Sequence, residues 1–356
     1  MEAMTRVADG PGASDTDGLE DKRAAMVAWQ EAAIAALGPV PDEVQEYWTT
    51  IITEDGFESK TLVIRPKPTI HNHADVPEDS DPAPRRPLIV LFHGGGFALG
   101  TPAMMTRPGR ELAERLGAVV VAPTYRRVPE HAWPGPSRSA WAVLAWLAEH
   151  AERELGASLD RGFVVGGFSA GASLATICAG VSLLPADHDL LTSDGGFNNR
   201  LARPITGVFA NCPMLLTEDI VPAEHRGLWR SRVENRDAQG LDSEGVELIW
   251  RVMNPDFYSP WTSPFSGWLR PDGGSGDEAV PVGIPHYIQV GRLDCLRDDG
   301  VVLYEALTSR GVTTRIDIFE KDGHTGWCAL PFESHSKNPT VEEATMAGFS
   351  WLLENV

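Results

Sequence analysis

A serine, a carboxylate and a histidine lie far apart in this sequence, each directly after a segment typical of a buried strand. Ser169 is the centre of Gly167-Phe168-Ser169-Ala170-Gly171, which follows the apolar run 163–166 and precedes the helix-like run 172–179. A sharp turn between strand and helix lifts a hydroxyl clear of a sheet, and glycines around it let neighbouring backbone approach closely. The pattern predicts a nucleophilic serine.

Asp294 and His324 follow the later strand-like runs 287–290 and 315–319. A serine hydroxyl is a weak nucleophile until a base takes its proton, and a carboxylate can hold an imidazole in the tautomer that does so. The spacing between the two residues leaves room for one helix, over 301–307, and one strand. We predict a Ser169–His324–Asp294 triad, with Asp298 and Asp299 as the alternative acids.

A second glycine-rich motif, His93-Gly94-Gly95-Gly96-Phe97, follows the strand-like run 88–92. Glycines leave backbone N–H groups unobstructed, and such groups can stabilise the oxyanion that develops when an ester carbonyl is attacked. We expect the N–H groups of Gly94, Gly95 and Ala170 to form this oxyanion hole. His93 is expected to orient the loop rather than to act as a base.

The sequence resembles the hormone-sensitive-lipase-like (HGGG) carboxylesterases of the α/β-hydrolase superfamily over about residues 85–355. The matching segments are the two glycine motifs, Tyr125-Arg126-Arg127-Val128-Pro129-Glu130-His131 with Trp133-Pro134, the run 294–300, and Gly323-His324. The resemblance implies an α/β-hydrolase fold, in which a mostly parallel central sheet is flanked by helices and covered by a helical cap. It also implies Ser169 as nucleophile, His324 as base and Asp294 as the residue that orients His324.

The chain departs from that family at several positions near the predicted site. Phe168 and Ala172 replace an acidic residue and a glycine, Cys295 stands where proline is usual, and Thr325-Gly326 follows the histidine. Because aromatic side chains gather around these segments, we expect an apolar pocket that suits a neutral ester with a compact acyl group. The pocket residues expected are Phe97, Phe168, Trp261 and Trp327.

The expected organisation is one hydrolase domain over 23–355, preceded by a disordered or loosely ordered segment, 1–22. An amphipathic helix from residue 23 and an insertion that breaks the strand–helix rhythm predict cap elements at about 23–50 and 214–270. The insertion holds Trp229, Trp250, Trp261 and Trp268. These indoles either line the pocket or seal the cap onto the core.

The composition of the chain argues against several classes of partner. The formal net charge of −20 over 356 residues argues against nucleic acid and against stable association with anionic membranes, because both require basic patches. The four cysteines have no metal-ligand spacing, and no motif indicates a metal or cofactor. Residues 1–10 lack the apolar core of a signal peptide, so a cytoplasmic location is expected. The sequence is compatible with a homodimer.

The sequence therefore predicts a serine hydrolase that cleaves a small or compact neutral carboxylic ester through an acyl-enzyme, in secondary metabolism. One alternative is a non-hydrolytic relative, such as an acyltransferase, lactonase or cyclase of natural-product biosynthesis. Another is a ligand-binding receptor. Receptors that resemble this family lose a triad residue, whereas this chain retains all three.

Overall fold

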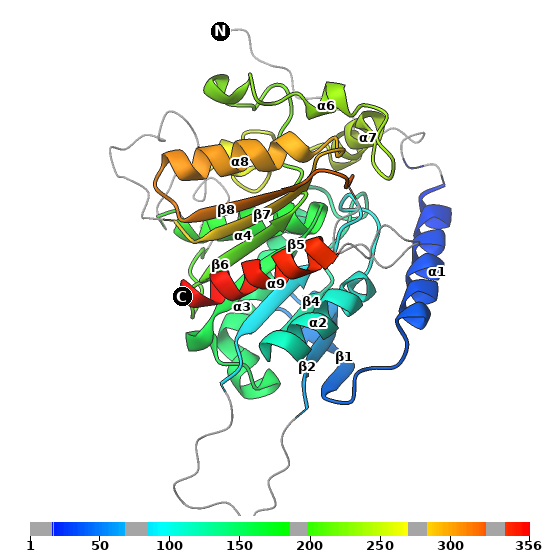
Figure 1. Cartoon of the computed structure of the whole chain (residues 1–356), viewed down its shortest axis with the longest axis vertical. Helices are drawn as coiled ribbons and strands as arrows, with labels where there is room; N and C mark the ends of the chain where they lie inside the picture. Colours follow the sequence, from blue (N-terminus) through cyan, green and yellow to red (C-terminus); the bar gives the residue numbers. More distant parts are fainter. Residues whose placement is uncertain (1–15, 17, 68–84, 186–197, 270–282, 325–338) are drawn as a thin grey trace, which may run out of the picture.

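The computed structural model describes residues 16, 18–67, 85–185, 198–269, 283–324 and 339–356 (Figure 1). Within these residues, one sheet has the strand order β1-β2-β4-β3-β5-β6-β7-β8. Its strands are β1 (Val44–Ile52), β2 (Glu58–Pro66), β3 (Leu88–Phe92), β4 (Val119–Pro123), β5 (Phe163–Phe168), β6 (Gly207–Asn211), β7 (His286–Gly291) and β8 (Thr314–Phe319).

The six strands from β3 to β8 are parallel, whereas β1 and β2 form an antiparallel hairpin at one edge. The hairpin corrects one expectation. Val44–Ile52 is paired along its whole length with β2, so residues 44–50 belong to the sheet and not to a cap. In this edge strand only Val44 and Ile51 are buried, and the other residues are partly or fully exposed. It therefore lacks the continuous apolar run by which the central strands are recognised in the sequence.

The central strands are mostly apolar because helices cover both faces of the sheet. In β3, Leu88, Val90 and Phe92 contribute to one buried cluster, and Ile89 and Leu91 contribute to the other. Successive side chains of a strand point to opposite faces, so a strand buried on both sides needs apolar residues at every position. The strand-like runs of the sequence therefore lie in the middle of the molecule.

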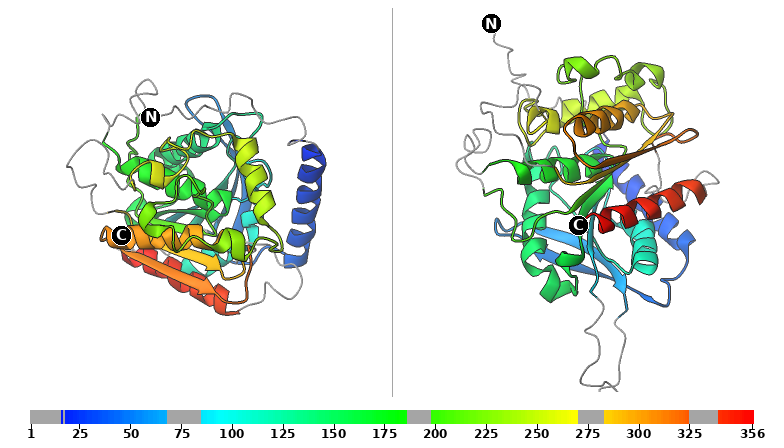
Figure 2. Two further views of the ribbon diagram at one scale, coloured as in Figure 1. Left: turned by 90° about the horizontal axis from the view of Figure 1, so that it is seen from above. Right: turned by 60° about the vertical axis from the view of Figure 1, so that its left-hand side comes forward.

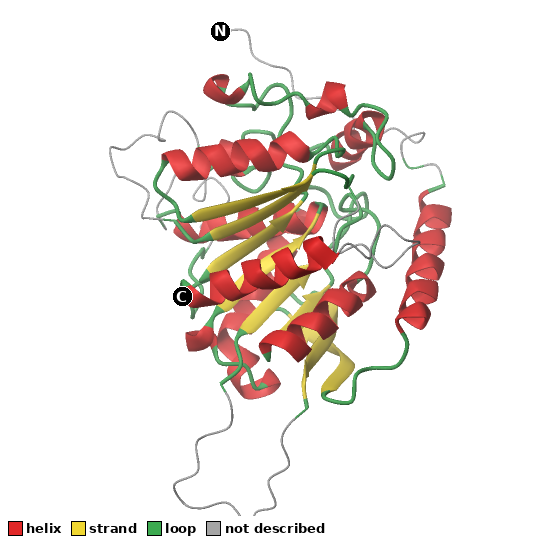
Figure 3. Cartoon of the chain, in the orientation of Figure 1, coloured by secondary structure: helices red, strands yellow, loops and turns green. Residues whose placement is uncertain are grey.

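Helices form layers on both sides of the sheet (Figure 3). Helices α2 and α9 pack on one face, in front of the sheet in Figure 1, while α3, α4 and α8 contribute to the cluster on the other face. Their bounds are α2 (Thr106–Leu116), α3 (Gly135–Leu155), α4 (Ala170–Leu183), α8 (Arg297–Ser309) and α9 (Pro339–Glu354). None of the described helices is long and apolar enough to cross a membrane.

Three further helices lie outside these layers, namely α1 (Leu19–Leu37), α6 (Ser231–Glu234) and α7 (Ser243–Met253). Helix α1 stands beside the sheet, and α7 lies on the same side of the molecule (Figures 1 and 2). Helix α1 begins at Leu19, so the boundary expected at residue 22 falls inside the helix. Residues 1–15 and 17 lie outside the described residues.

Candidate active site

Ser169 lies in a strained turn between β5 and α4, with φ 55° and ψ −122°. A Cβ on Gly171 would come within 2.0 Å of the Phe92 carbonyl oxygen, and one on Gly167 within 2.5 Å of the same atom. Only glycine fits where the turn packs this closely against the end of β3. The Ser169 N–H donates to the Asn211 carbonyl at 2.8 Å, which fixes the turn to β6. The two glycines of the motif thus serve the close approach of backbone.

The structure brings Ser169, His324 and Asp294 together from the ends of three strands. The Ser169 Oγ lies 2.9 Å from His324 Nε2, and His324 Nδ1 lies 2.9 Å from Asp294 Oδ2. An ionised carboxylate can only accept, so Nδ1 carries the proton and Nε2 accepts from the serine hydroxyl. This tautomer leaves Nε2 free to take the Ser169 proton during attack on a substrate.

Asp294 is fully buried, and the Leu296 N–H donates to its Oδ1 at 2.8 Å. Burial raises the pKa of this carboxyl, but the electrostatic interaction with His324 and the hydrogen bonds that Asp294 accepts outweigh burial and hold the pKa below its usual range. The carboxylate is therefore ionised at neutral pH, as a group that stabilises an imidazolium must be.

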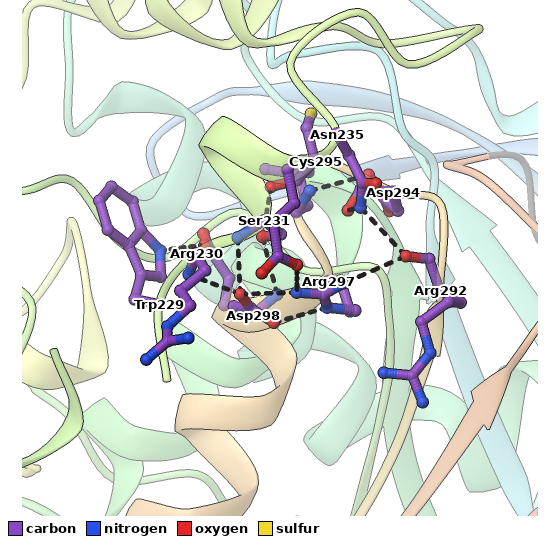
Figure 4. A network of polar contacts seen from close by, with 12 residues as sticks. Trp229, Arg230, Ser231, Asn235, Arg292, Asp294, Cys295, Arg297 and Asp298 are labelled. Atoms are coloured by element: carbon purple, nitrogen blue, oxygen red, sulfur yellow. Dashed lines mark hydrogen bonds and ion pairs between the residues drawn. The ribbon is translucent and has the colours of Figure 1, made fainter. Parts of the chain in front are cut away.

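Asp298 and Asp299, the alternative acids, face away from His324 and bind the segment before α6. The Asp298 carboxylate accepts the N–H groups of Arg230 and Ser231, each at 2.6 Å, and forms an ion pair with Arg297 at 2.7 Å (Figure 4). The Asp299 carboxylate accepts two backbone N–H groups and the Trp229 Nε1–H, the last at 2.9 Å. Both acids join the inserted segment to the start of α8.

The loop after β3 is held from behind by a buried histidine and tyrosine. His93 Nδ1 lies 2.8 Å from the Gly94 carbonyl, and the imidazole stacks on the Tyr125 ring with centroids 4.5 Å apart. The Tyr125 hydroxyl donates to the His93 carbonyl at 3.0 Å. Burial lowers the pKa of His93 to about 4, so the ring is neutral at pH 7. These contacts agree with an orienting role for His93.

A cavity of about 400 Å³ opens over the triad. Gly95, Gly96, Ser169 and His324 lie in its wall, whereas Gly94 packs behind them against Phe168. The geometry therefore favours Gly96 over Gly94 as the partner of Gly95 in an oxyanion hole. The sequence motif contains three equivalent glycines, and only the curvature of the loop distinguishes them.

The two cap helices supply much of the remaining wall. From α1 come Leu19, Lys22, Met26 and Trp29, and from α7 come Leu248, Ile249 and Val252. Except for Lys22, these side chains are apolar or aromatic. The cap expected from residues 23–50 and 214–270 thus reaches the cavity through α1 and α7.

Not all of the residues expected in the pocket line the cavity. Phe168 lines the cavity, and its ring lies 5.0 Å from that of His324. Phe97 and Trp261 do not line it, and both are corrections. Phe97 is buried against Trp133, and Trp261 is buried against Trp141, sealing the insertion onto α3. Trp327 lies outside the described residues.

Cys212 lies near the triad, although no sequence pattern predicts that position. Cys212, directly after β6, brings its sulfur to within 4.8 Å of ligand-type atoms of both Asp294 and His324. These three residues form the group of potential metal ligands found in the described part of the chain. A cysteine at the end of a strand has no motif around it, and only the sheet order places it beside Asp294.

Comparisons with known proteins agree with this geometry. Residues 89–327 match the family model described as the alpha/beta hydrolase fold. Esterase LipI of Mycobacterium tuberculosis is 30% identical over 266 residues, which cover 74% of this chain and 71% of that protein. Versiconal hemiacetal acetate esterase of Dothistroma septosporum is 28% identical and covers 76% of each chain.

Among solved structures, vibralactone cyclase superposes with a TM-score of 0.73 at 24% identity, covering 99% of this chain and 92% of the cyclase. At that identity the likeness concerns the fold alone. The family match spans well over half of the chain and includes both glycine motifs, Asp294 and His324. The chain therefore belongs to the α/β-hydrolase fold family, as a hormone-sensitive-lipase-like hydrolase of the carboxylesterase type.

Proposed function

We propose that this protein hydrolyses a neutral carboxylic ester with a compact acyl group, in secondary metabolism, through an acyl-enzyme on Ser169. The observation that carries the proposal is the hydrogen-bonded chain Ser169–His324–Asp294, of which Ser169 and His324 lie in the wall of a largely apolar cavity. A relative whose name describes an acetate esterase adds support for a compact acyl group.

In the first half of the reaction, Ser169 Oγ attacks the ester carbonyl while His324 Nε2 takes its proton. The negative charge on the carbonyl oxygen is stabilised by N–H groups of Gly95, Gly96 and Ala170. The C–O bond to the alcohol then breaks, and His324 returns the proton to the departing alkoxide. Asp294 stabilises the imidazolium that exists between the two transfers.

In the second half, water attacks the acyl carbonyl of the ester formed on Ser169, and His324 again accepts the proton. Collapse of the second tetrahedral intermediate breaks the bond to Oγ and restores the serine hydroxyl with that proton. One ester and one water become one acid and one alcohol. An acyltransferase would use an alcohol in place of this water, so the released product distinguishes the two reactions.

The test replaces Ser169 with Ala and measures hydrolysis of p-nitrophenyl butyrate together with covalent labelling by a fluorophosphonate. Both should be abolished, because Ser169 occupies the nucleophile turn. Ser173, which follows on α4 and is buried, provides a control: Ser173→Ala should still be labelled. Labelling that persists in Ser169→Ala would refute the assignment of Ser169 as the nucleophile. Consumption of p-nitrophenyl butyrate without release of free butyric acid would refute hydrolysis.

A further inference from the structure

Backbone strain in the described residues is concentrated around the triad. Four residues other than glycine have a positive φ, namely Phe97, Ser169, Cys212 and Asn254. This conformation costs an L-residue roughly 1 kcal/mol or more, and it often marks a functional position. Ser169 is the nucleophile, and Phe97 closes the glycine-rich loop. Cys212, with φ 50°, has no part in the reaction proposed above.

The strained turn at Cys212 directs its side chain toward the triad acid. Its N–H donates to the Gln289 carbonyl at 2.8 Å, so the backbone stays attached to β7 where β6 ends. The side chain is buried, and the sulfur lies within 4.8 Å of the Asp294 carboxylate and a His324 ring nitrogen. The Cys212 side chain also contributes to lowering the pKa of Asp294, as expected of an S–H group that faces the carboxylate.

We propose that Cys212 is a positioning residue for the triad, whose S–H donates the third hydrogen bond to the Asp294 carboxylate. This inference rests on the proposed function, in which Asp294 orients His324. The other two donors are the Leu296 N–H, on Oδ1, and His324 Nδ1, on Oδ2. A carboxylate restrained from three directions cannot rotate about its Cβ–Cγ bond, so Oδ2 stays aligned with the imidazole.

Such a residue should affect the rate of the chemical step and not the binding of substrate. Cys212 lies behind Asp294 and is absent from the wall of the cavity over Ser169. Replacing it should therefore lower kcat and leave KM nearly unchanged. A purely structural residue would instead lower the melting temperature without a specific effect on kcat in the folded enzyme.

The experiment compares Cys212→Ala, Cys212→Ser and a matched control, Cys178→Ala. All three replacements carry a Cβ, so the strained φ at position 212 is equally accessible to each residue placed there. Cys178 is equally buried but lies on α4, with its thiol 3.8 Å from the Ser137 carbonyl. We expect kcat to fall about tenfold in Cys212→Ala, with KM within about twofold. Cys212→Ser keeps a donor and should recover most of that loss, and Cys178→Ala should keep the wild-type kcat.

A double-mutant cycle tests whether Cys212 acts through Asp294. In the Asp294→Asn background the carboxylate is gone, so Cys212→Ala should cause little further loss in the rate of fluorophosphonate labelling. Equal losses in both backgrounds would overturn the proposal, as would a Cys212→Ser variant as slow as Cys212→Ala. Inactivation by EDTA that Zn²⁺ reverses would also overturn it, because the three residues would then hold a metal.

These outcomes separate the inference from the proposed function. If Ser169→Ala and Asp294→Asn abolish or severely reduce labelling while Cys212→Ala labels at the wild-type rate, only the role of Cys212 fails. If Ser169→Ala is still labelled, the proposed function itself fails.

Discussion

At the residue scale, two carboxylates four positions apart have different roles because of the donors around them. Asp294 meets an imidazole and accepts the Leu296 N–H. Asp298 meets Arg297 and two backbone N–H groups from the segment before α6. The same side-chain chemistry thus serves catalysis at one position and attachment of the insertion at the other.

The two carboxylates should respond differently to the same isosteric replacement. Asp294→Asn should lower kcat by about 10⁴, because an amide no longer holds the imidazole in the tautomer that accepts the Ser169 proton. Asp298→Asn should instead lower stability by about 1–3 kcal/mol, because an amide nitrogen facing the Arg230 and Ser231 N–H groups leaves donors unsatisfied. Steady-state kinetics and urea denaturation of both variants measure the two effects. The opposite ranking in kcat would show that the acid is misassigned.

The sequence was sufficient to predict that Ser169, Asp294 and His324 meet, because each follows a strand-like run and has a chemically distinctive side chain. Gly96 was not separable from Gly94, since both occur in one glycine run and differ only in which side of the loop they face. Cys212 was not recognisable at all. Its proximity to Asp294 depends on β6 and β7 being neighbours in the sheet, and no local pattern records that pairing.

At the scale of elements, the cap decides how much of a substrate can be buried. Helix α7 presses Ile249 against the glycine-rich loop, where a Cβ on Gly96 would come within 2.8 Å of the Ile249 side chain. Helix α1 forms the facing wall. Side chains from two separate segments of the chain therefore form walls of the cavity beside the nucleophile.

These two walls predict a limit on the length of the acyl chain. Each methylene buried in an apolar pocket is worth roughly 1–3 kcal/mol, so kcat/KM should rise from acetyl to butyryl esters and then fall at octanoyl and palmitoyl. Ile249→Ala should move the optimum to a longer chain, because it removes part of the wall. Ile52→Ala, at a site 61% exposed on the edge strand, is the control. An optimum at palmitoyl in the wild type would contradict the prediction.

Arg23 attaches helix α1 to the loops around the site. Arg23 donates to the Ala98 carbonyl at 2.9 Å and to the Val128 carbonyl at 3.2 Å, and it pairs with Glu130 at 2.6 Å. Ala98 belongs to the loop that follows the three glycines. The same side chain therefore attaches both the cap helix and the loop that carries the oxyanion donors.

Arg23→Gln should weaken substrate binding more than catalysis. The shorter amide cannot reach all of these acceptors, so α1 should lose its fixed position and the wall formed by Met26 and Trp29 should loosen. We expect KM for p-nitrophenyl butyrate to rise about tenfold, as when roughly 1.4 kcal/mol of binding is lost. Arg153→Gln, which removes an arginine 71% exposed to solvent, should leave KM unchanged. An unchanged KM in Arg23→Gln would show that α1 is held by other contacts.

At the scale of the whole molecule, the parallel strands follow from the sequence, whereas the edge strand β1 does not. Strands buried on both faces are mostly apolar in sequence, so β3 to β7 could be placed from their residues alone. The edge strand β1 mixes polar and apolar residues and was assigned to the cap. The sequence also places Trp261 in the pocket, because an indole in an insertion can either line a cavity or pack between the insertion and the core. Only the packing of the insertion against α3 separates the two roles.

The buried core also contains two histidines whose protonation is linked to folding. Burial lowers the pKa of both His93 and His286 to about 4. Their pKa in the unfolded chain is about 6.5. As the pH falls below 6.5, these histidines therefore bind protons in the unfolded state but remain neutral in the folded state. The stability associated with these neutral rings is therefore fully present above pH 6.5 and declines toward pH 4.

We expect the free energy of unfolding to fall between pH 6.5 and pH 5 by up to about 1.4 kcal/mol per pH unit for each of the two histidines. His286 lies on β7 with Nδ1 2.7 Å from the Ile284 carbonyl, and it does not line the cavity, so it can be replaced without touching the site. His286→Gln should roughly halve the slope, because an amide has no proton to gain in this range. Urea denaturation of the wild type and His286→Gln at pH 7.5, 6 and 5 measures how the free energy of unfolding depends on pH. Ester hydrolysis at pH 7.5 checks that the variant is folded. A slope as steep in His286→Gln as in the wild type would mean that other groups govern the acid sensitivity of the fold.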